Sequence, residues 1–398
     1  MVQNRSKHPQ ARLLKCLAVP AALFFAVLSL AACGSSSSDS TGSDTTSPPA
    51  SETVKSGESG GSGFVAESEK AVAEHEKPLT EWTGPTKSPG PVPAGKRVVV
   101  ITCTNAAPLC LDSAKGVSNA ASAVGWEAQI VDGGGTPSKW DSAVQTAITG
   151  KADAIVMASA QPGLVPDAIA AAKSAGIPVM TTLTCEESPP EGVIAQFESP
   201  RFEAGFVLGQ WLVSENPEGA EALYLESPEF SCLQHAGAGF KAALKKAGSD
   251  FSIAEEVSSP QSDTTSPKGA QRVAAMMRSH PDAAGLWAMS EVWAPTFEQA
   301  ALTTGSSEIV GLGVDGETFL PQVREGSKFV MAGPDTFEYG WWVVDGLIRY
   351  FNGEPQVEAE IPFRVIDENN ADETTGERIT AENNYEEEWL KLWGVPAG

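Results

Sequence analysis

Histidine is scarce in this chain, and so are residue patterns that hold a metal ion. Only four histidines occur in 398 residues. No two cysteines and no two histidines stand at the short spacings that zinc sites use. We therefore expect no metal, and nothing else in the sequence calls for a cofactor.

Catalytic signatures are missing as well. After residue 95 there is no Gly-x-Ser-x-Gly elbow, no phosphate loop ending in Gly-Lys-Ser/Thr and no His-Glu-x-x-His pair. Gly133-Gly134-Gly135 lacks the spacing of a dinucleotide fingerprint, and a flexible turn is the simpler interpretation. We expect a binding protein rather than an enzyme.

Positive charge is in short supply. The chain has 27 Lys and Arg against 51 Asp and Glu. Four of the basic residues lie before residue 33, so the chain from that point carries a net charge of about −28. A surface this acidic repels phosphate backbones, which excludes nucleic acid as an expected partner.

The N-terminal apolar run, Leu17 to Leu30, is shorter than the roughly 20 residues that span a bilayer. Basic residues precede it and Leu30-Ala31-Ala32-Cys33-Gly34 ends it, which is the order of a signal peptide. The ending resembles the lipobox of bacterial lipoproteins. That resemblance implies a signal peptide over 1–32 and a lipidated Cys33, which would anchor the protein outside the cytoplasm; a plain signal peptide with an incidental cysteine is the alternative.

Composition then divides the rest of the chain. Residues 33–63 are rich in Ser, Gly, Thr, Asp, Glu and Pro and predict a flexible linker, with a rigid glycosylated stem as the alternative. We expect residues 64–95 to form a lead-in segment that packs along the surface of the first lobe. The remaining 300 residues or so exceed the size of one hydrophobic core, so we expect two lobes.

From residue 96 onward, short β-branched runs alternate with Ala-rich segments of helical length. Near-continuous apolar strands such as Val98 to Ile101 are typical of parallel sheets that helices cover on both faces. The sequence predicts an α/β fold of two doubly wound parallel-sheet lobes joined by a hinge. We expect residues 96–198 plus 333–357 in the first lobe and 199–332 plus 358–398 in the second.

Four cysteines remain after Cys16 and Cys33 are set aside. In an exported protein an even number indicates disulfides, and proximity favours Cys103 with Cys110. A bridge between Cys185 and Cys232 is a weaker expectation, because these two residues could lie on opposite lobes.

Five segments between about residues 97 and 352 resemble the ribose- and galactose-binding proteins of bacterial ABC importers, which have the type I periplasmic-binding-protein fold. They are Val98-Val99-Val100-Ile101 with Pro108 after it, Lys151 to Val156, Ala175-Gly176-Ile177-Pro178-Val179, Ala236 to Phe240, and Val310-Gly311-Leu312-Gly313-Val314-Asp315-Gly316. The resemblance implies a ligand cleft between the lobes, lined by residues that follow the strand ends.

The resemblance also implies which residues line the cleft. Asp315 matches the family's ligand-binding aspartate. An equally good interpretation is that Asp315 and Gly316 only form a turn, since Asp-Gly is a favoured turn pair. Ser290 and Glu291 match a polar pair after the preceding strand. Trp293 could stack on a sugar face, with an ordinary core position as the alternative. Asn105 and Gln234 complete the expected polar contacts.

The chain also departs from the family. Where the family has an Asp-Arg pair that binds vicinal hydroxyls, this chain has Leu183-Thr184-Cys185. The family's aromatic pair after the first strand falls near Leu109 and Cys110, and its domain-two arginine falls near Gln234. A sugar bound in the usual way is therefore in doubt. Carboxylates without an arginine partner would favour a neutral or cationic ligand.

Two functions fit these features. The first is an anchored monomer that captures a small polar, sugar-like ligand and delivers it to an ABC permease in the membrane. The second is a sensory lipoprotein of the same fold that signals to a membrane receptor.

Overall fold

The computed structural model describes residues 60–184, 186, 188–227, 231–316, 318–374 and 376–396. The signal-peptide and Cys33 predictions and residues 33–59 of the predicted linker lie outside this part of the chain, as does Cys185. The last four residues of the predicted linker, 60–63, are instead the first residues of helix α1 (Gly60–His75). Gly57 to Gly398 forms one compact unit, which contains every described residue. Among these residues, no helix is both long and apolar enough to cross a membrane.

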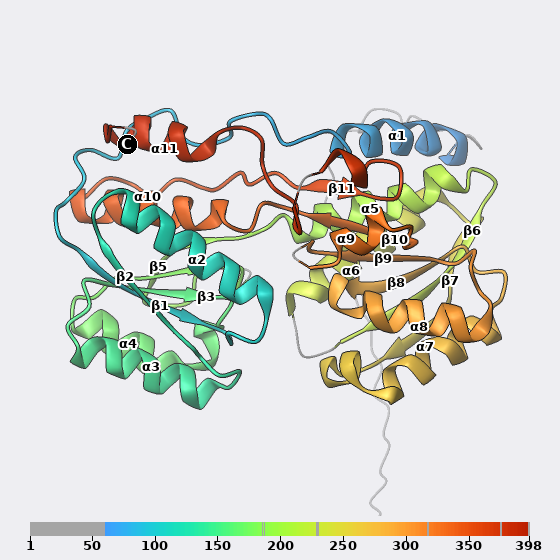
Figure 1. The fold of residues 1–398 in the computed structure, drawn as a ribbon, viewed down its shortest axis with the longest axis horizontal. Coiled ribbons are helices and arrows are strands. Elements are labelled where there is room, and N and C mark those ends of the chain that lie inside the picture. The colour runs from blue at the N-terminus through green and yellow to red at the C-terminus, as the bar shows by residue number, and fades with distance from the viewer. Residues whose placement is uncertain are drawn as a thin grey trace, which may run out of the picture. The chain divides into compact units, whose positions relative to one another are not determined.

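Lobe 1 is built on a five-stranded parallel sheet with the order β2-β1-β3-β4-β5 (Figure 1). Its strands are β1 (Arg97–Thr102), β2 (Glu127–Val131), β3 (Ala154–Ala158), β4 (Val179–Thr182) and β5 (Val193–Phe197). Helices α2 (Pro108–Ala123) and α10 (Glu338–Asn352) pack on one face, and α3 (Pro137–Thr149) and α4 (Pro166–Ser174) on the other, with the 3₁₀ turn η1 (Pro162–Leu164) before α4. Both faces are thus covered, which explains the continuous apolar strands.

Lobe 2 is built on a six-stranded sheet with the order β11-β10-β9-β8-β6-β7, in which only β11 is antiparallel to its neighbour. Its strands are β6 (Ala220–Glu226), β7 (Phe251–Ser258), β8 (Gly285–Ser290), β9 (Val310–Val314), β10 (Phe329–Gly333) and β11 (Arg364–Ile366). Its helices are α5 (Arg201–Glu215), α6 (Ser231–Ala247), α7 (Pro267–Ser279), α8 (Ala294–Thr304) and the short α9 (Leu320–Arg324), with 3₁₀ turns η2 (Gln261–Thr265), η3 (Glu291–Trp293) and η4 (Ala371–Glu373). The predicted α/β fold of two doubly wound lobes is confirmed.

Three segments of chain join the two sheets. Residues 198–200 lead from β5 to α5, residues 334–337 lead from β10 back to α10, and residues 353–363 lead from α10 to β11. These segments form the hinge. Two of them begin at the carboxyl ends of β5 and β10, so the hinge directly adjoins the edge where a ligand would bind.

The segment before β1 joins both lobes, and we call residues 60–95 the N-terminal strap. Its helix α1 (Gly60–His75) packs on α5 and α6 of lobe 2, and Phe64 is buried in the core of that lobe. The strap then reaches lobe 1, where Trp126 donates its Nε1–H to the carbonyl of Pro93 at 2.6 Å. The prediction that this segment straps onto the first lobe misses the lobe 2 contact, because the apolar face of α1 is completed by α5 and α6.

A second segment, the C-terminal strap (residues 364–393), also joins both lobes. It begins with β11 in lobe 2 and ends with α11 (Tyr385–Trp393), whose Trp393 stacks on Trp341 of α10 at 5.6 Å (Figure 1). The structure therefore places α11 against lobe 1, although residues 358–398 were expected in the second lobe. The backbone N–H of Glu382 donates to the carbonyl of Leu79 at 2.8 Å, so the two straps also contact each other.

Candidate functional site

The candidate site lies at the carboxyl ends of the parallel strands of lobe 2, next to the hinge. Strand β8 leads into Ser290 and Glu291, and β9 leads into Asp315. Ligands of open α/β sheets bind at this edge, where loops can vary without disturbing the sheet. The sequence placed its candidate residues there for the same reason.

Asp315 forms an ion pair with Arg201, the first residue of α5. Both residues are buried, with exposed fractions of 6% and 5%. Asp315 has a φ of 77° and its N–H donates to the carbonyl of Ala332 at 3.0 Å. A Cβ on Gly333 would lie 2.9 Å from the carbonyl carbon of Asp315, so glycine is needed there for the two strand ends to approach. The main chain thus fixes the position of the carboxylate.

Sequence reasoning missed Arg201. The expectation that the site's carboxylates lack an arginine partner is wrong, because the guanidinium of Arg201 reaches Asp315 from 114 residues away. No local pattern links these two positions. The available signal was the location of Arg201 directly after the segment between the lobes.

Glu291 is held by donors from the loop that follows β9. Its carboxylate accepts hydrogen bonds from the Thr318 N–H at 3.0 and 3.1 Å, the Thr318 hydroxyl at 3.0 Å and the Phe319 N–H at 3.0 Å. Burial raises the pKa of Glu291, and the charge of Asp315 adds to the shift, while these hydrogen bonds oppose it. Glu291 is therefore placed to order the loop beside Asp315.

Ser290 and Trp293 are buried at the same edge, with exposed fractions of 3% and 0%. Trp293 belongs to the core of lobe 2, and a Cβ on Gly269 would lie 3.3 Å from its ring. The ring therefore offers no free face to a ligand in this structure. Trp293 is therefore an ordinary core residue in this structure and not a surface on which a sugar could stack.

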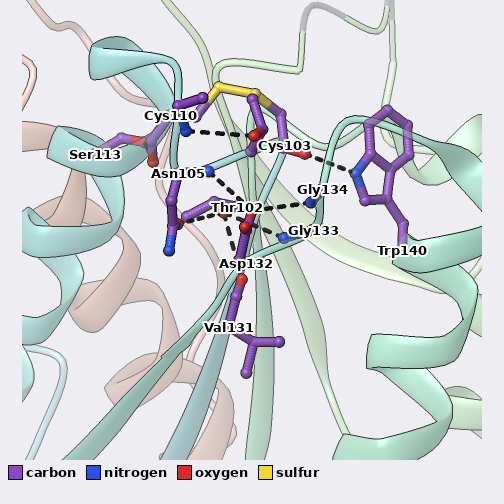
Figure 2. Close-up of a disulfide and its surroundings, with 12 residues drawn as sticks. Thr102, Cys103, Asn105, Cys110, Ser113, Val131, Asp132, Gly133, Gly134 and Trp140 are labelled. Atoms are coloured by element: carbon purple, nitrogen blue, oxygen red, sulfur yellow. Dashed lines mark hydrogen bonds between the residues drawn. A yellow bond between two sulfur atoms is a disulfide. The ribbon is translucent and has the colours of Figure 1, made fainter. Parts of the chain in front are cut away.

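Asn105 lies in the loop between β1 and α2, at the carboxyl edge of lobe 1. It is exposed, its side-chain oxygen accepts from the Thr102 hydroxyl at 2.9 Å, and its N–H donates to Asp132 at 2.9 Å. The backbone N–H groups of Asn105 and Gly134 lower the pKa of Asp132. Figure 2 shows this loop folded over the end of β1.

The same loop contains the expected disulfide. Cys103 and Cys110 are bonded, with their Cα atoms 5.8 Å apart (Figure 2). The carbonyl of Cys103 accepts from Trp140 Nε1–H at 3.0 Å, which ties the loop to α3. Cys232 is also disulfide-bonded. Cys185 is not among the described residues, so the pairing of these two cysteines stays a prediction.

Gln234 and Thr184 follow the carboxyl ends of two further strands, β6 and β4. Gln234 is exposed in the first turn of α6, after β6. Thr184 follows β4, and both its N–H and its hydroxyl donate to Glu198 of the hinge, at 3.0 and 2.8 Å. The family has its Asp-Arg pair at this place, after β4. In this chain the residue there, Thr184, forms hydrogen bonds to the hinge instead.

Another buried acidic group, Glu338, is the first residue of α10 and directly follows the hinge segment 334–337. Its exposed fraction is 0%, and neither carboxylate oxygen has a hydrogen-bond partner within the described part of the chain. Burial, together with the nearby Asp335, raises the pKa of Glu338 to about 8. Asp335 itself accepts from the N–H groups of Phe337 and Ala381, at 2.9 and 3.0 Å, which ties the C-terminal strap to the hinge.

The two most voluminous of the cavities found among the described residues lie outside this edge. One of about 810 Å³ is lined by the N-terminal strap and the hinge, including His75, Gln196 and Phe363. One of about 630 Å³ lies at the opposite, amino-terminal edge of the lobe 2 sheet, beside Trp211 and Lys328. Within the described residues, no three or more His, Cys, Asp or Glu side chains are grouped to hold a metal ion.

Known proteins resemble this chain over the two lobes. Residues 98–355 match the periplasmic binding protein domain. The ribose import binding protein RbsB of Escherichia coli (strain K12) is 24% identical over 221 residues, which are 55% of this chain and 71% of that protein. A solute binding protein from Mycobacterium smegmatis, solved with bound glycerol, has a TM-score of 0.62 at 23% identity and covers 72% of this chain and 99% of its own.

Another solved relative is a solute binding protein from Burkholderia graminis in complex with D-arabinose. Its TM-score is 0.62 at 21% identity, over 71% of this chain and 98% of its own. These likenesses agree with the two-lobe topology described above. The chain belongs to the periplasmic-binding-protein family, with the type I fold of the sugar-binding proteins of ABC transporters.

Proposed function

We propose that this protein is an extracytoplasmic solute-binding protein that captures a small polar, sugar-like ligand between its lobes and delivers it to an ABC importer. The observation that carries the proposal is the buried pair of Arg201 and Asp315 at the carboxyl edge of lobe 2. A charged pair in the interior costs desolvation energy unless each charge is satisfied, so burial there calls for a reason beyond stability.

The residues at this edge suggest how a ligand would be held. The Asp315 carboxylate accepts hydrogen bonds from ligand hydroxyls, and Asn105 and Gln234 add polar contacts from lobe 1 and from α6. Glu291 keeps the loop after β9 in place. Binding closes the lobes only if the ligand contacts the closed form better than the open one.

We also propose that Cys33 carries the membrane anchor, on the lipobox resemblance alone. One acyl chain binds a membrane only marginally, whereas two or more hold firmly. The mature protein would then remain at the cell surface, beside the permease it serves.

The test is calorimetric titration of the protein against monosaccharides, polyols, nucleosides and amines. Asp315→Ala and the isosteric Asp315→Asn should weaken binding of the best ligand about ten- to hundredfold, because an unpaired buried donor costs roughly 1 to 3 kcal/mol. Asp282→Ala, an exposed aspartate of lobe 2 between α7 and β8, is the matched control and should leave affinity unchanged. Circular dichroism confirms folding.

Two results would overturn the proposal. The first is that both folded Asp315 variants bind as tightly as the wild type. The second is that no small polar compound binds the wild type at all. Delivery is tested separately, since a strain that lacks this gene should lose uptake of the radiolabelled ligand.

A further inference from the structure

The cavity of about 630 Å³ at the amino-terminal edge of the lobe 2 sheet is separate from the candidate site. Three neighbouring strands meet at this edge. Strand β11 ends there, because it runs antiparallel to β10, whereas β10 and β9 begin there. The last turn of α5 also lines the cavity, through Trp211 and Glu215. All of these walls belong to lobe 2.

The cavity has an aromatic floor. Trp211 of α5 and Phe329, the first residue of β10, both line it and are both buried. The Nε1–H of Trp211 donates to the carboxylate of Asp367 at 3.2 Å, which fixes the indole and the acid side by side. A ligand with an apolar body would gain free energy by covering this floor.

A buried hydroxyl lines the same cavity without a partner. Ser327 lies two residues before β10, and its exposed fraction is only 8%. Its Oγ has no hydrogen-bond partner within the part of the chain that the structure describes. Buried hydroxyls are usually paired, because an unmatched one costs free energy. Ser327 therefore indicates a ligand group that forms the missing hydrogen bond.

The charges around Ser327 indicate what that group is. Asp367 and Glu368 follow β11 and Glu308 precedes β9, so acidic residues stand at both ends of the three-strand row. Glu215 is the last residue of α5, and the carbonyl end of a helix adds partial negative charge. Glu215 and Glu368 form no ion pair among the described residues. The cavity therefore suits a cation that donates hydrogen bonds.

The basic residue of the cavity does not neutralise this charge. Lys328 pairs with Glu308 at 3.5 Å, and because both side chains are exposed the pair contributes little. A half-buried neighbour, Glu76 of α1, also reports the excess. Burial raises the pKa of Glu76, and the charges of Asp367 and Glu215 add to the shift.

The length of the acidic row selects among cations. Neighbouring strands lie about 4.8 Å apart, so the end of β11 and the start of β9 are about 10 Å apart. A single metal ion is too compact for this row, and no group of three or more His, Cys, Asp or Glu among the described residues could hold one. We propose that this edge of lobe 2 is a second ligand site, which binds an aliphatic polyamine. The inference goes beyond the proposed function and does not depend on it.

The probe is spermidine, an aliphatic triamine, in calorimetric titrations of the full chain. Salt is kept at about 0.15 M, where exposed charges more than about 8 Å apart are largely screened. The wild type should bind one spermidine per chain. It should bind butylamine, which has one amine, and Mg²⁺, which is compact, at least about tenfold more weakly.

Three variants test the residues of the cavity. Glu215→Gln/Glu368→Gln should weaken spermidine binding at least about tenfold, because it removes both carboxylates that lack an ion pair. Ser327→Ala should weaken binding about three- to tenfold by removing the buried acceptor. Lys328→Gln should strengthen binding about threefold, since it removes a like charge from the middle of the row. Circular dichroism confirms folding.

Two controls locate the effect. Glu127→Gln/Glu387→Gln removes the same charge at exposed residues of β2 and α11, and Asp315→Asn alters the candidate site between the lobes. Both should bind spermidine as the wild type does.

Four results would overturn the inference. They are no saturable binding to the wild type, weaker binding by Lys328→Gln, an equal loss in Glu127→Gln/Glu387→Gln, which indicates general attraction to an acidic surface, and loss of binding in Asp315→Asn. The last result would place the amine between the lobes and leave the proposed function standing.

Discussion

Gly340 of α10 lies directly against Gly116 of α2. A Cβ on Gly340 would lie 1.9 Å from the carbonyl carbon of Gly116, and a Cβ on Gly116 would lie 2.3 Å from the carbonyl oxygen of Phe337. The two helices of lobe 1 thus meet backbone to backbone, just after the hinge segment 334–337. This contact sets how α10 continues from the hinge into lobe 1.

Adding a methyl group at this contact should be costly. Gly340→Ala and Gly116→Ala should each lower the free energy of unfolding by about 1 to 3 kcal/mol or more, because main-chain atoms cannot move aside. Urea denaturation measures the effect. Gly63→Ala in α1 is the control, since nothing lies within 4 Å of that Cβ, and equal effects at all three sites would contradict the interpretation.

Glu338 should make stability fall as pH rises. Its pKa is raised from 4.5 to about 8 in the folded protein, so the folded state keeps a proton that the unfolded state releases. Between pH 4.5 and 8 the free energy of unfolding should therefore drop, by at most about 1.4 kcal/mol per pH unit from this group.

Glu338→Gln should flatten that slope, and the variant should be the more stable protein near the upper end of the window. Thermal denaturation at several pH values measures both effects. Glu127→Gln, at an exposed residue of β2, should retain the wild-type slope. A Glu338→Gln profile parallel to that of the wild type would show that the carboxyl group is already ionised in the folded protein.

The Cys103–Cys110 bridge should contribute about 2 to 3 kcal/mol by restricting a short loop in the unfolded chain. The paired substitution Cys103→Ser/Cys110→Ser should lose this amount in denaturant titrations, with the fold retained. Peptide mapping without reductant should recover the cross-linked peptide, and the same map tests Cys185 with Cys232. Alkylation of Cys103 and Cys110 in the native, unreduced protein would refute the bridge.

Cys33→Ala should block lipid attachment. We expect unprocessed precursor or protein released to the medium, because the chain then has no acyl anchor. Fractionation and mass spectrometry of the N-terminal peptide measure this outcome. Normal processing and membrane retention of the variant would exclude Cys33 as the anchor.

Regular strands could be predicted because their residues are uniformly apolar. Val98 to Ile101 are almost entirely buried, as their composition indicates. Strand β5 has mixed burial and β11 has only three residues, so the sequence pattern of neither one indicates a strand clearly. The local sequence pattern does not predict such edge strands, because they form by pairing with the neighbouring strand of the sheet.

The site was predictable only in part, and for a related reason. Asp315 and Glu291 follow strand ends, so topology placed them together. The partners of these carboxylates were not predictable, since Arg201 and Thr318 reach them through tertiary folding. Trp293 shows the same limit, because its place in the core depends on how α7 and α8 pack.

The N-terminal strap decides which lobe receives a mechanical load. Tension from any tether ahead of residue 60 would enter the molecule through α1, which is fastened to α5 and α6 rather than to lobe 1. Under such tension, lobe 2 would be the half that is held. The force would reach lobe 1 only through the rest of the strap and the hinge segments.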